Sequence, residues 1–146
     1  MDTKSNVTVT GTPRIVLTDK DGNVKQDFSV PNLVVTTGKT FIAARMVGTP
    51  TAMSHMALGT GTTAAAVGNT ALETELVRVA LATASSTGAV TTYVASFPAG
   101  TGTGAITESG IFNASSSGTM LCRTTFPVVN KGADDTMSIT WTITIQ

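Results

Sequence analysis

The chain of 146 residues is long enough for one domain with its own core, and it carries nine Lys and Arg against nine Asp and Glu. Charged residues make up only 12% of it, against about 25% in an ordinary soluble domain, which does not suit nucleic-acid binding through basic patches. A single cysteine excludes an intrachain disulfide, and no apolar run approaches the ~20 residues of a membrane span.

Such a neutral, charge-poor chain suits lasting contact with other proteins, and we expect partner chains to cover part of its surface. Neither a membrane nor nucleic acid is expected among its partners. The N-terminus shows no Sec-type signal. The one cysteine, Cys122, lies in an apolar run and is expected to be a small buried side chain.

The first thirty residues predict an N-terminal arm or an added hairpin. Val7 and Val9 alternate with threonines, residues 15–18 continue as a strand, and residues 24–30 form the return strand. The turn between them contains Asp-Gly, a strong hairpin signal. Asp19, Asp21 and Asn23 also resemble the start of a calcium loop, but the glycine is misplaced and no Glu follows at the required distance. We therefore predict a turn.

Residues 34–46, VVTTGKTFIAARM, look like a phosphate-binding loop because a strand runs through GKT into a helix. The pattern requires a glycine five residues before Gly38, where the chain has Leu33. We predict instead a strand end, a turn at Gly38, and a helix over residues 39–47 with Thr37 as its cap. This helix is expected to cover an edge or end of a sheet, or to dock on a neighbour.

The second half of the chain predicts paired strands. Residues 70–73 match a capping box and a single helical turn, and residues 77–82 are expected to pair with residues 90–97 across a Ser-Ser-Thr-Gly turn. Residues 106–112 pair with 119–126. At the C-terminus five apolar residues alternate with Ser and Thr, which predicts a strand with one buried face: Met137, Ile139, Trp141, Ile143 and Ile145.

Many short strands separated by turns predict one all-β domain over residues 1–146. The expected architecture is an antiparallel β-sandwich, jelly-roll-like or Ig-like, with one short helix. The Gly/Thr-rich segments at residues 59–63 and 100–104 are expected to be long loops.

Nothing in the sequence predicts an enzyme. GTGTT at residues 59–63 has Ala64 where a dinucleotide loop has its third glycine, and it lacks a βαβ context. His55 has no partners for a triad or a zinc site, and Asp134 with Asp135 lacks calcium-loop spacing. We expect no catalytic residue, no cofactor and no metal.

Two segments resemble a family of small virion structural proteins of tailed bacteriophages. Residues 53–81 contain ALGTGTT, NTAL and TELVR, and residues 93–145 contain ITESGIFN, GTMLCRTTF, a lysine turn and a closing Thr-rich strand with Trp. The block E-x-G-[IL]-F followed by G-x-[ML]-x-x-R also resembles repeats of phage tail-collar and fibre proteins. The likeness covers most of the chain after Asn32.

The resemblance implies a homo-oligomer, expected as a trimer, on the exterior of a phage particle after synthesis in the host cytoplasm. We expect a capsid decoration or cement protein that binds the major capsid protein, because the chain ends just after its last strand. The alternative is a neck, collar or tail-fibre attachment protein that binds other tail proteins or a host-surface glycan. Trp141 and Tyr93 are the aromatic candidates for sugar stacking, although Trp141 falls in a row predicted to be buried.

Residues with a structural or subunit-contact role are expected along the quoted motifs, in the N-terminal arm and in the Gly/Thr loops. Glu108 is expected to accept backbone N–H groups or to pair with Arg123 across a hairpin, and Gly110 to permit a bulge or a close approach. The full set is Lys39, Phe41, Arg78, Glu108, Gly110, Phe112, Arg123 and Trp141.

Overall fold

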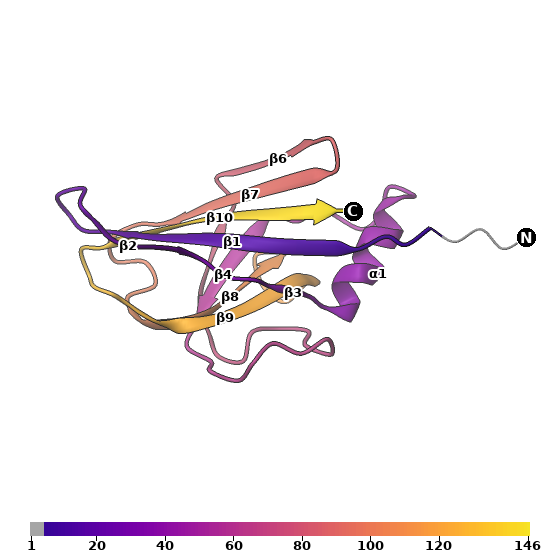
Figure 1. The fold of residues 1–146 in the computed structure, drawn as a ribbon. Helices are drawn as coiled ribbons and strands as arrows, with labels where there is room; N and C mark the ends of the chain where they lie inside the picture. Colours follow the sequence, from indigo (N-terminus) through magenta and orange to yellow (C-terminus); the bar gives the residue numbers. More distant parts are fainter. Residues whose placement is uncertain (1–4) are drawn as a thin grey trace, which may run out of the picture.

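The computed structural model describes residues 5–146 and consists of two antiparallel five-stranded sheets that enclose one main core (Figure 1). The first sheet has the order β2-β1-β10-β7-β6, and the second β3-β9-β8-β4-β5. This arrangement confirms the predicted all-β sandwich. The strands are β1 (Val9–Thr18), β2 (Val24–Ser29), β3 (Leu33–Val34), β4 (His55–Gly59), β5 (Glu75–Ala80), β6 (Thr83–Thr87), β7 (Val90–Phe97), β8 (Gly104–Phe112), β9 (Met120–Lys131) and β10 (Thr136–Ile145).

The alternating C-terminal segment forms β10 as predicted, between β1 and β7. Its apolar residues from Met137 to Ile143 face the core, and the Trp141 side chain is fully buried. The β1–β2 hairpin also forms, but β1 pairs with β10 along its whole length. Residues 9–29 are therefore integral to the sandwich and not a separate arm, residues 5–8 precede the first strand, and residues 1–4 lie outside the described residues.

The predicted pairing of residues 77–82 with β7 is wrong. That segment forms β5 at an edge of the second sheet, where it pairs with β4, and the hairpin partner of β7 is β6. β6 reads TASST and is exposed throughout, so it carries no apolar alternation that would reveal a strand. β4 is nearly all buried and equally lacks a period-2 pattern.

The helix α1 (Thr36–Arg45) begins three residues earlier than predicted, so Gly38 lies inside it and is not a turn. No side chain caps its first turn; Thr37 instead donates to the Met120 carbonyl oxygen, 3.1 Å away. A Cβ at residue 38 would overlap the Leu121 carbonyl oxygen. The glycine therefore lets α1 lie directly on the backbone of β9, with Phe41 buried beneath it.

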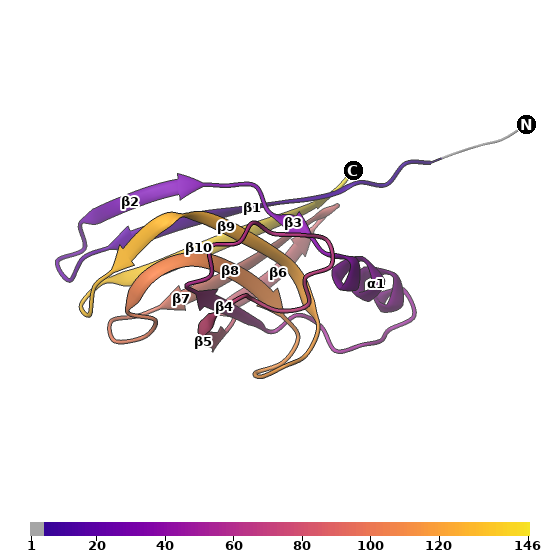
Figure 2. The ribbon, with the colours of Figure 1, turned by 90° about the horizontal axis from the view of Figure 1, so that it is seen from below.

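Figures 1 and 2 place α1 at one end of the sandwich, near the C-terminus. This position agrees with the prediction that the helix covers an end of a sheet. The turns that join β1 to β2 and β9 to β10 lie at the opposite end. Residues 70–73, predicted as a helical turn, form an irregular loop. No helix within residues 5–146 is long and apolar enough to cross a membrane.

Candidate functional site: a buried ion pair beneath a long loop

The most conspicuous polar feature is a buried ion pair on the outer face of the second sheet. Glu108 on β8 and Arg123 on β9 lie two residues apart in register, because Glu108 faces Thr125 while Arg123 faces Gly110. The Arg123 Nε lies 3.3 Å from the Glu108 Oε1, and both side chains are almost completely buried. Residues 60–74 connect β4 to β5, and contacts from this loop shield the pair from water.

The two charges hold this loop by hydrogen bonds to its backbone. The Glu108 carboxylate accepts from the N–H groups of Glu73 at 2.8 Å and Thr74 at 3.1 Å. The Arg123 guanidinium donates to the Thr63 carbonyl oxygen at 2.9 Å and to the Asn69 Oδ1 at 3.1 Å. Both predicted roles of Glu108, as an acceptor of N–H groups and as a partner of Arg123, are confirmed.

These bonds also explain why the capping box did not form a helix. The Glu73 N–H points at Glu108, and the Glu73 carboxylate accepts the Thr63 N–H at 3.1 Å. Hydrogen bonding from Thr63 lowers the pKa of the Glu73 carboxyl, with Arg123 contributing to the same shift. The hydrogen bonds between this loop and the sheet therefore replace the local bonds that a helical turn at residues 70–73 would make.

Glycines and a small apolar cluster complete the contact between loop and sheet. A Cβ on Gly110 would lie 3.0 Å from the Leu72 side chain and 3.1 Å from the Cys122 carbonyl oxygen, and one on Gly59 would lie 2.8 Å from the Glu108 Cγ. The predicted close approach at Gly110 is thus confirmed. Leu72 of the loop packs into a second core cluster, whose members are Val35, Ala57, Leu72, Phe112 and Met120.

Arg78 on β5 fixes a second loop, the connection from β8 to β9. Its guanidinium pairs with Glu75 at 2.7 and 3.1 Å, donates to the carbonyl oxygens of Ala114 and Ser117, and lies 3.7 Å from the ring centre of Phe112. A cation over a ring face gains further attraction. The basic side chains at residues 78 and 123 therefore each anchor a long loop.

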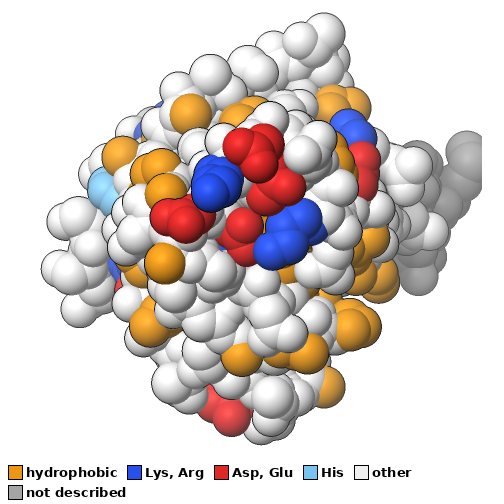
Figure 3. Space-filling model, turned by 90° about the vertical axis from the view of Figure 1, so that its left-hand side faces the viewer, with side chains coloured by type: hydrophobic (Ala, Val, Ile, Leu, Met, Phe, Trp, Pro, Cys, Tyr) orange, Lys and Arg blue, Asp and Glu red, His pale blue; other side chains and the backbone are white. Residues whose placement is uncertain are grey.

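The end of the molecule opposite α1 carries its own charged cluster (Figure 3). Asp135 accepts from the Lys25 Nζ at 2.9 Å and from the Gly132 N–H at 2.7 Å, and the Lys25 bond lowers the pKa of the Asp135 carboxyl. The buried Lys131 donates to the Pro98 carbonyl oxygen. Asp19 accepts two N–H groups of its own turn, which supports the turn interpretation over a calcium loop.

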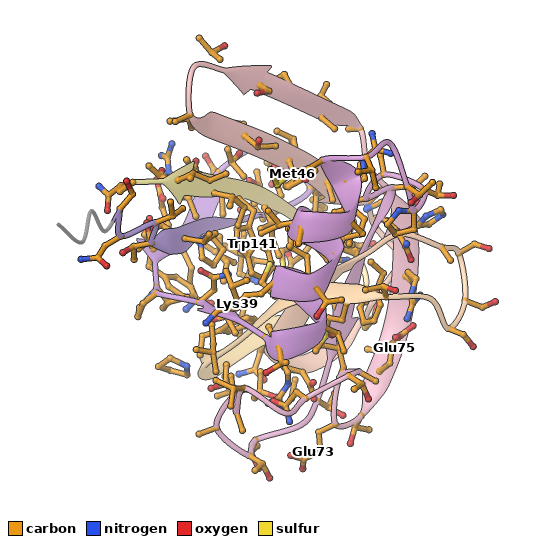
Figure 4. The ribbon with its side chains drawn as sticks, turned by 90° about the vertical axis from the view of Figure 1, so that its right-hand side faces the viewer. Lys39, Met46, Glu73, Glu75 and Trp141 are labelled. Atoms are coloured by element: carbon orange, nitrogen blue, oxygen red, sulfur yellow. The ribbon has the colours of Figure 1, made fainter. Side chains whose placement is uncertain are left out.

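Other candidate residues do not assemble into reactive sites. The His55 Nδ1 lies 2.8 Å from the Ser54 Oγ, and among the described residues no group of three His, Cys, Asp or Glu side chains could hold a metal ion. Cys122 is buried as predicted, and burial raises the pKa of its thiol. Trp141 has no exposed ring face for sugar stacking, since it lies inside the sandwich behind α1 (Figure 4).

The predicted contact residues therefore divide into two groups. Lys39 is exposed on α1, whereas Phe41, Gly110, Phe112 and Trp141 are buried within the chain. Arg78, Glu108 and Arg123 anchor loops. A structural role within the chain therefore fits these residues, whereas their contact with another subunit stays a prediction. Thr63, Asn69 and Leu72 were not predicted as contact residues, although they lie in the quoted motifs ALGTGTT and NTAL.

Comparisons of the chain with protein-family models, curated proteins and solved structures give no match.

Proposed function

We propose that this protein is a structural component of a tailed-phage virion, a decoration or cement protein that binds the outside of the capsid and stabilises it through subunit contacts. One observation carries the proposal. The segments that resemble phage virion proteins, residues 53–81 and 93–145, meet in space at the Glu108–Arg123 pair and at Arg78. The motifs that carry the resemblance thus contact one another in the folded chain.

The role of these contacts is to hold two loops in place against the sheet. The buried carboxylate and guanidinium bind the loop, and the two terminal nitrogens of the guanidinium each donate one bond, to the Asn69 Oδ1 and to the Thr63 carbonyl oxygen. Burying an ion pair costs desolvation energy, and in some proteins such pairs are retained because they specify one geometry. Two long loops held rigidly against a sheet form a surface of constant shape, which suits a protein that docks many times on a repeating lattice.

The composition supports the same role. A decoration protein is permanently covered on one side, so it tolerates a surface with few charges. Apolar side chains are exposed near the α1 end, with Val7 70%, Met46 85% and Val47 81% accessible. Met46 projects from the end of α1 in Figure 4. Repeated contacts of standard size, about 1,600 Å² each, would link neighbouring capsid subunits against internal pressure.

The proposal is tested with purified protein and capsids assembled without it. We expect saturable binding to the capsids in co-sedimentation and a higher temperature of capsid disruption when the protein is bound. A variant with Met46→Glu and Val47→Glu serves as an interface probe, because both side chains are exposed and their loss leaves the core intact. Absence of capsid binding, together with binding to isolated necks or tails, would replace the decoration role by the attachment role.

A further inference from the structure

Strand β6 is the least protected sheet edge among the described strands. A sheet edge presents unpaired N–H and C=O groups, and proteins usually guard it with charges, proline, a bulge, shortness or a covering element. β3 has two residues and runs into α1. β2 carries Lys25 and Asp27, and β5 carries Glu75 and Arg78; the pairing of each shows a register shift.

None of these devices protects β6. Its five residues, TASST, contain no charge and no proline, its pairing with β7 has no register shift, and every residue is exposed. The surrounding chain is equally neutral, since residues 79–107 contain no Asp, Glu, Lys, Arg or His. In Figure 4 the β6–β7 hairpin stands at the margin of the sandwich.

The face of the sheet beside β6 continues this neutral surface. By register, Ser85 lies beside Thr92 and then Thr142, while Thr83 lies beside Val94 and then Thr140. The next row holds Thr87, Val90 and Thr144. A strand added here would remove water from hydroxyl and methyl groups but not from any ionised group. The desolvation cost is therefore lower than at an edge that carries charged side chains.

We propose that β6 pairs antiparallel with β6 of a second copy of this chain, joining two first sheets into one continuous sheet across a two-fold axis. The sequence of β6 has the required symmetry. Antiparallel self-pairing centred on Ser85 places Thr83 opposite Thr87 of the second copy and Ala84 opposite Ser86. Small side chains meet small ones, Thr meets Thr, and no like charges face each other.

This contact deepens the proposed function by naming one surface through which copies meet, but the observations that carry it hold wherever the protein acts. A closed two-fold contact predicts a dimer, whereas the resemblance led us to expect a trimer. Five residues of backbone pairing form an interface below the standard size, so the free dimer is weak, with a Kd in the micromolar to millimolar range. Many copies on one particle would reinforce it.

The test is sedimentation velocity of the full chain over a range of concentrations. We expect a concentration-dependent dimer, and Ser85→Lys raises its Kd at least tenfold because two like charges then meet at the axis. Thr12→Lys is the matched control, since this exposed residue lies on the same face but on the interior strand β1. It should change the Kd less than twofold. A monomer at all concentrations, a trimer, or equal effects of both variants would overturn the proposal.

Cysteine substitution gives a second, independent readout. Directly opposed residues of antiparallel strands have Cα atoms about 4.5–5.5 Å apart, which lies inside the range of about 4.4–6.8 Å that a disulfide spans. Under mild oxidation with diamide, Ser85→Cys should form a covalent dimer far faster than Thr12→Cys, while the native Cys122 stays buried. Equal rates for the two variants would contradict the pairing. Dimer formation without capsid binding would refute the proposed function alone, and capsid binding by a strict monomer would refute the β6 contact alone.

Discussion

Replacing Glu108 by Gln is the sharpest test of the buried ion pair. The side chain keeps its length, but it loses its charge and one of its two acceptor oxygens. Its carboxylate now accepts from Glu73, Thr74 and Arg123. In the variant the amide NH₂ group must face one of these donors, and Arg123 is left buried without a counter-charge.

The expected loss of stability is about 3–5 kcal/mol, the range found when one partner of a buried ion pair is removed. Native domains have a free energy of unfolding of about 5–15 kcal/mol, so the variant should fold with a much reduced margin. At about 2–4 °C per kcal/mol for a chain of this size, Tm falls by roughly 6–20 °C. The loop over residues 60–74 should loosen first, because its backbone N–H groups lose their acceptors.

Urea unfolding followed by circular dichroism measures the change, and hydrogen exchange at the Glu73 and Thr74 amides locates it. Asp27→Asn is the control: it also removes one carboxylate charge, from the solvent-exposed pair with Arg14, and should leave the unfolding curve and the exchange of the two amides nearly unchanged. Arg123→Met and the double variant complete a cycle, in which we expect a coupling energy of about 1–3 kcal/mol. A loss below 1 kcal/mol for Glu108→Gln, with unchanged exchange, would refute the anchoring role.

Three further predictions concern other parts of the fold. Gly38→Ala should destabilise the protein by about 1–3 kcal/mol in urea unfolding, because a Cβ there overlaps the Leu121 carbonyl oxygen, whereas Gly68→Ala, in open space, should change it by less than about 0.5 kcal/mol. Asp135 has a folded pKa below its unfolded value, so its contribution is present above the unfolded pKa and is lost as pH falls through the folded pKa. Asp135→Asn should therefore flatten the acid side of a stability–pH curve, and an unchanged curve would contradict this. The Cys122 thiol should react with a thiol reagent only at the rate of unfolding, and fast labelling of the native protein would contradict its burial.

Local patterns in the sequence were enough to predict the all-β class and several strands. The alternation in β10 survives in the structure because one face of that strand meets the core and the other does not, so side-chain period and burial coincide. The Asp-Gly turn likewise specifies the β1–β2 hairpin through its own backbone preferences. Buried Cys122 and the Glu108–Arg123 pair also followed from residue type and hairpin register.

Tertiary structure decided what no local pattern contains. β4 is buried on both faces and β6 is exposed on both, so neither strand shows an alternation of apolar and polar residues. Their pairing partners depend on the order of the strands in the two sheets. The residues 70–73 carry a helical signal that a distant carboxylate on β8 overrides. The local pattern predicts a turn at Gly38, whereas in the structure this residue is a point of contact between α1 and β9. In each case the deciding atoms come from a strand remote in sequence, because sheet pairing and loop anchoring are long-range interactions that a local pattern cannot encode.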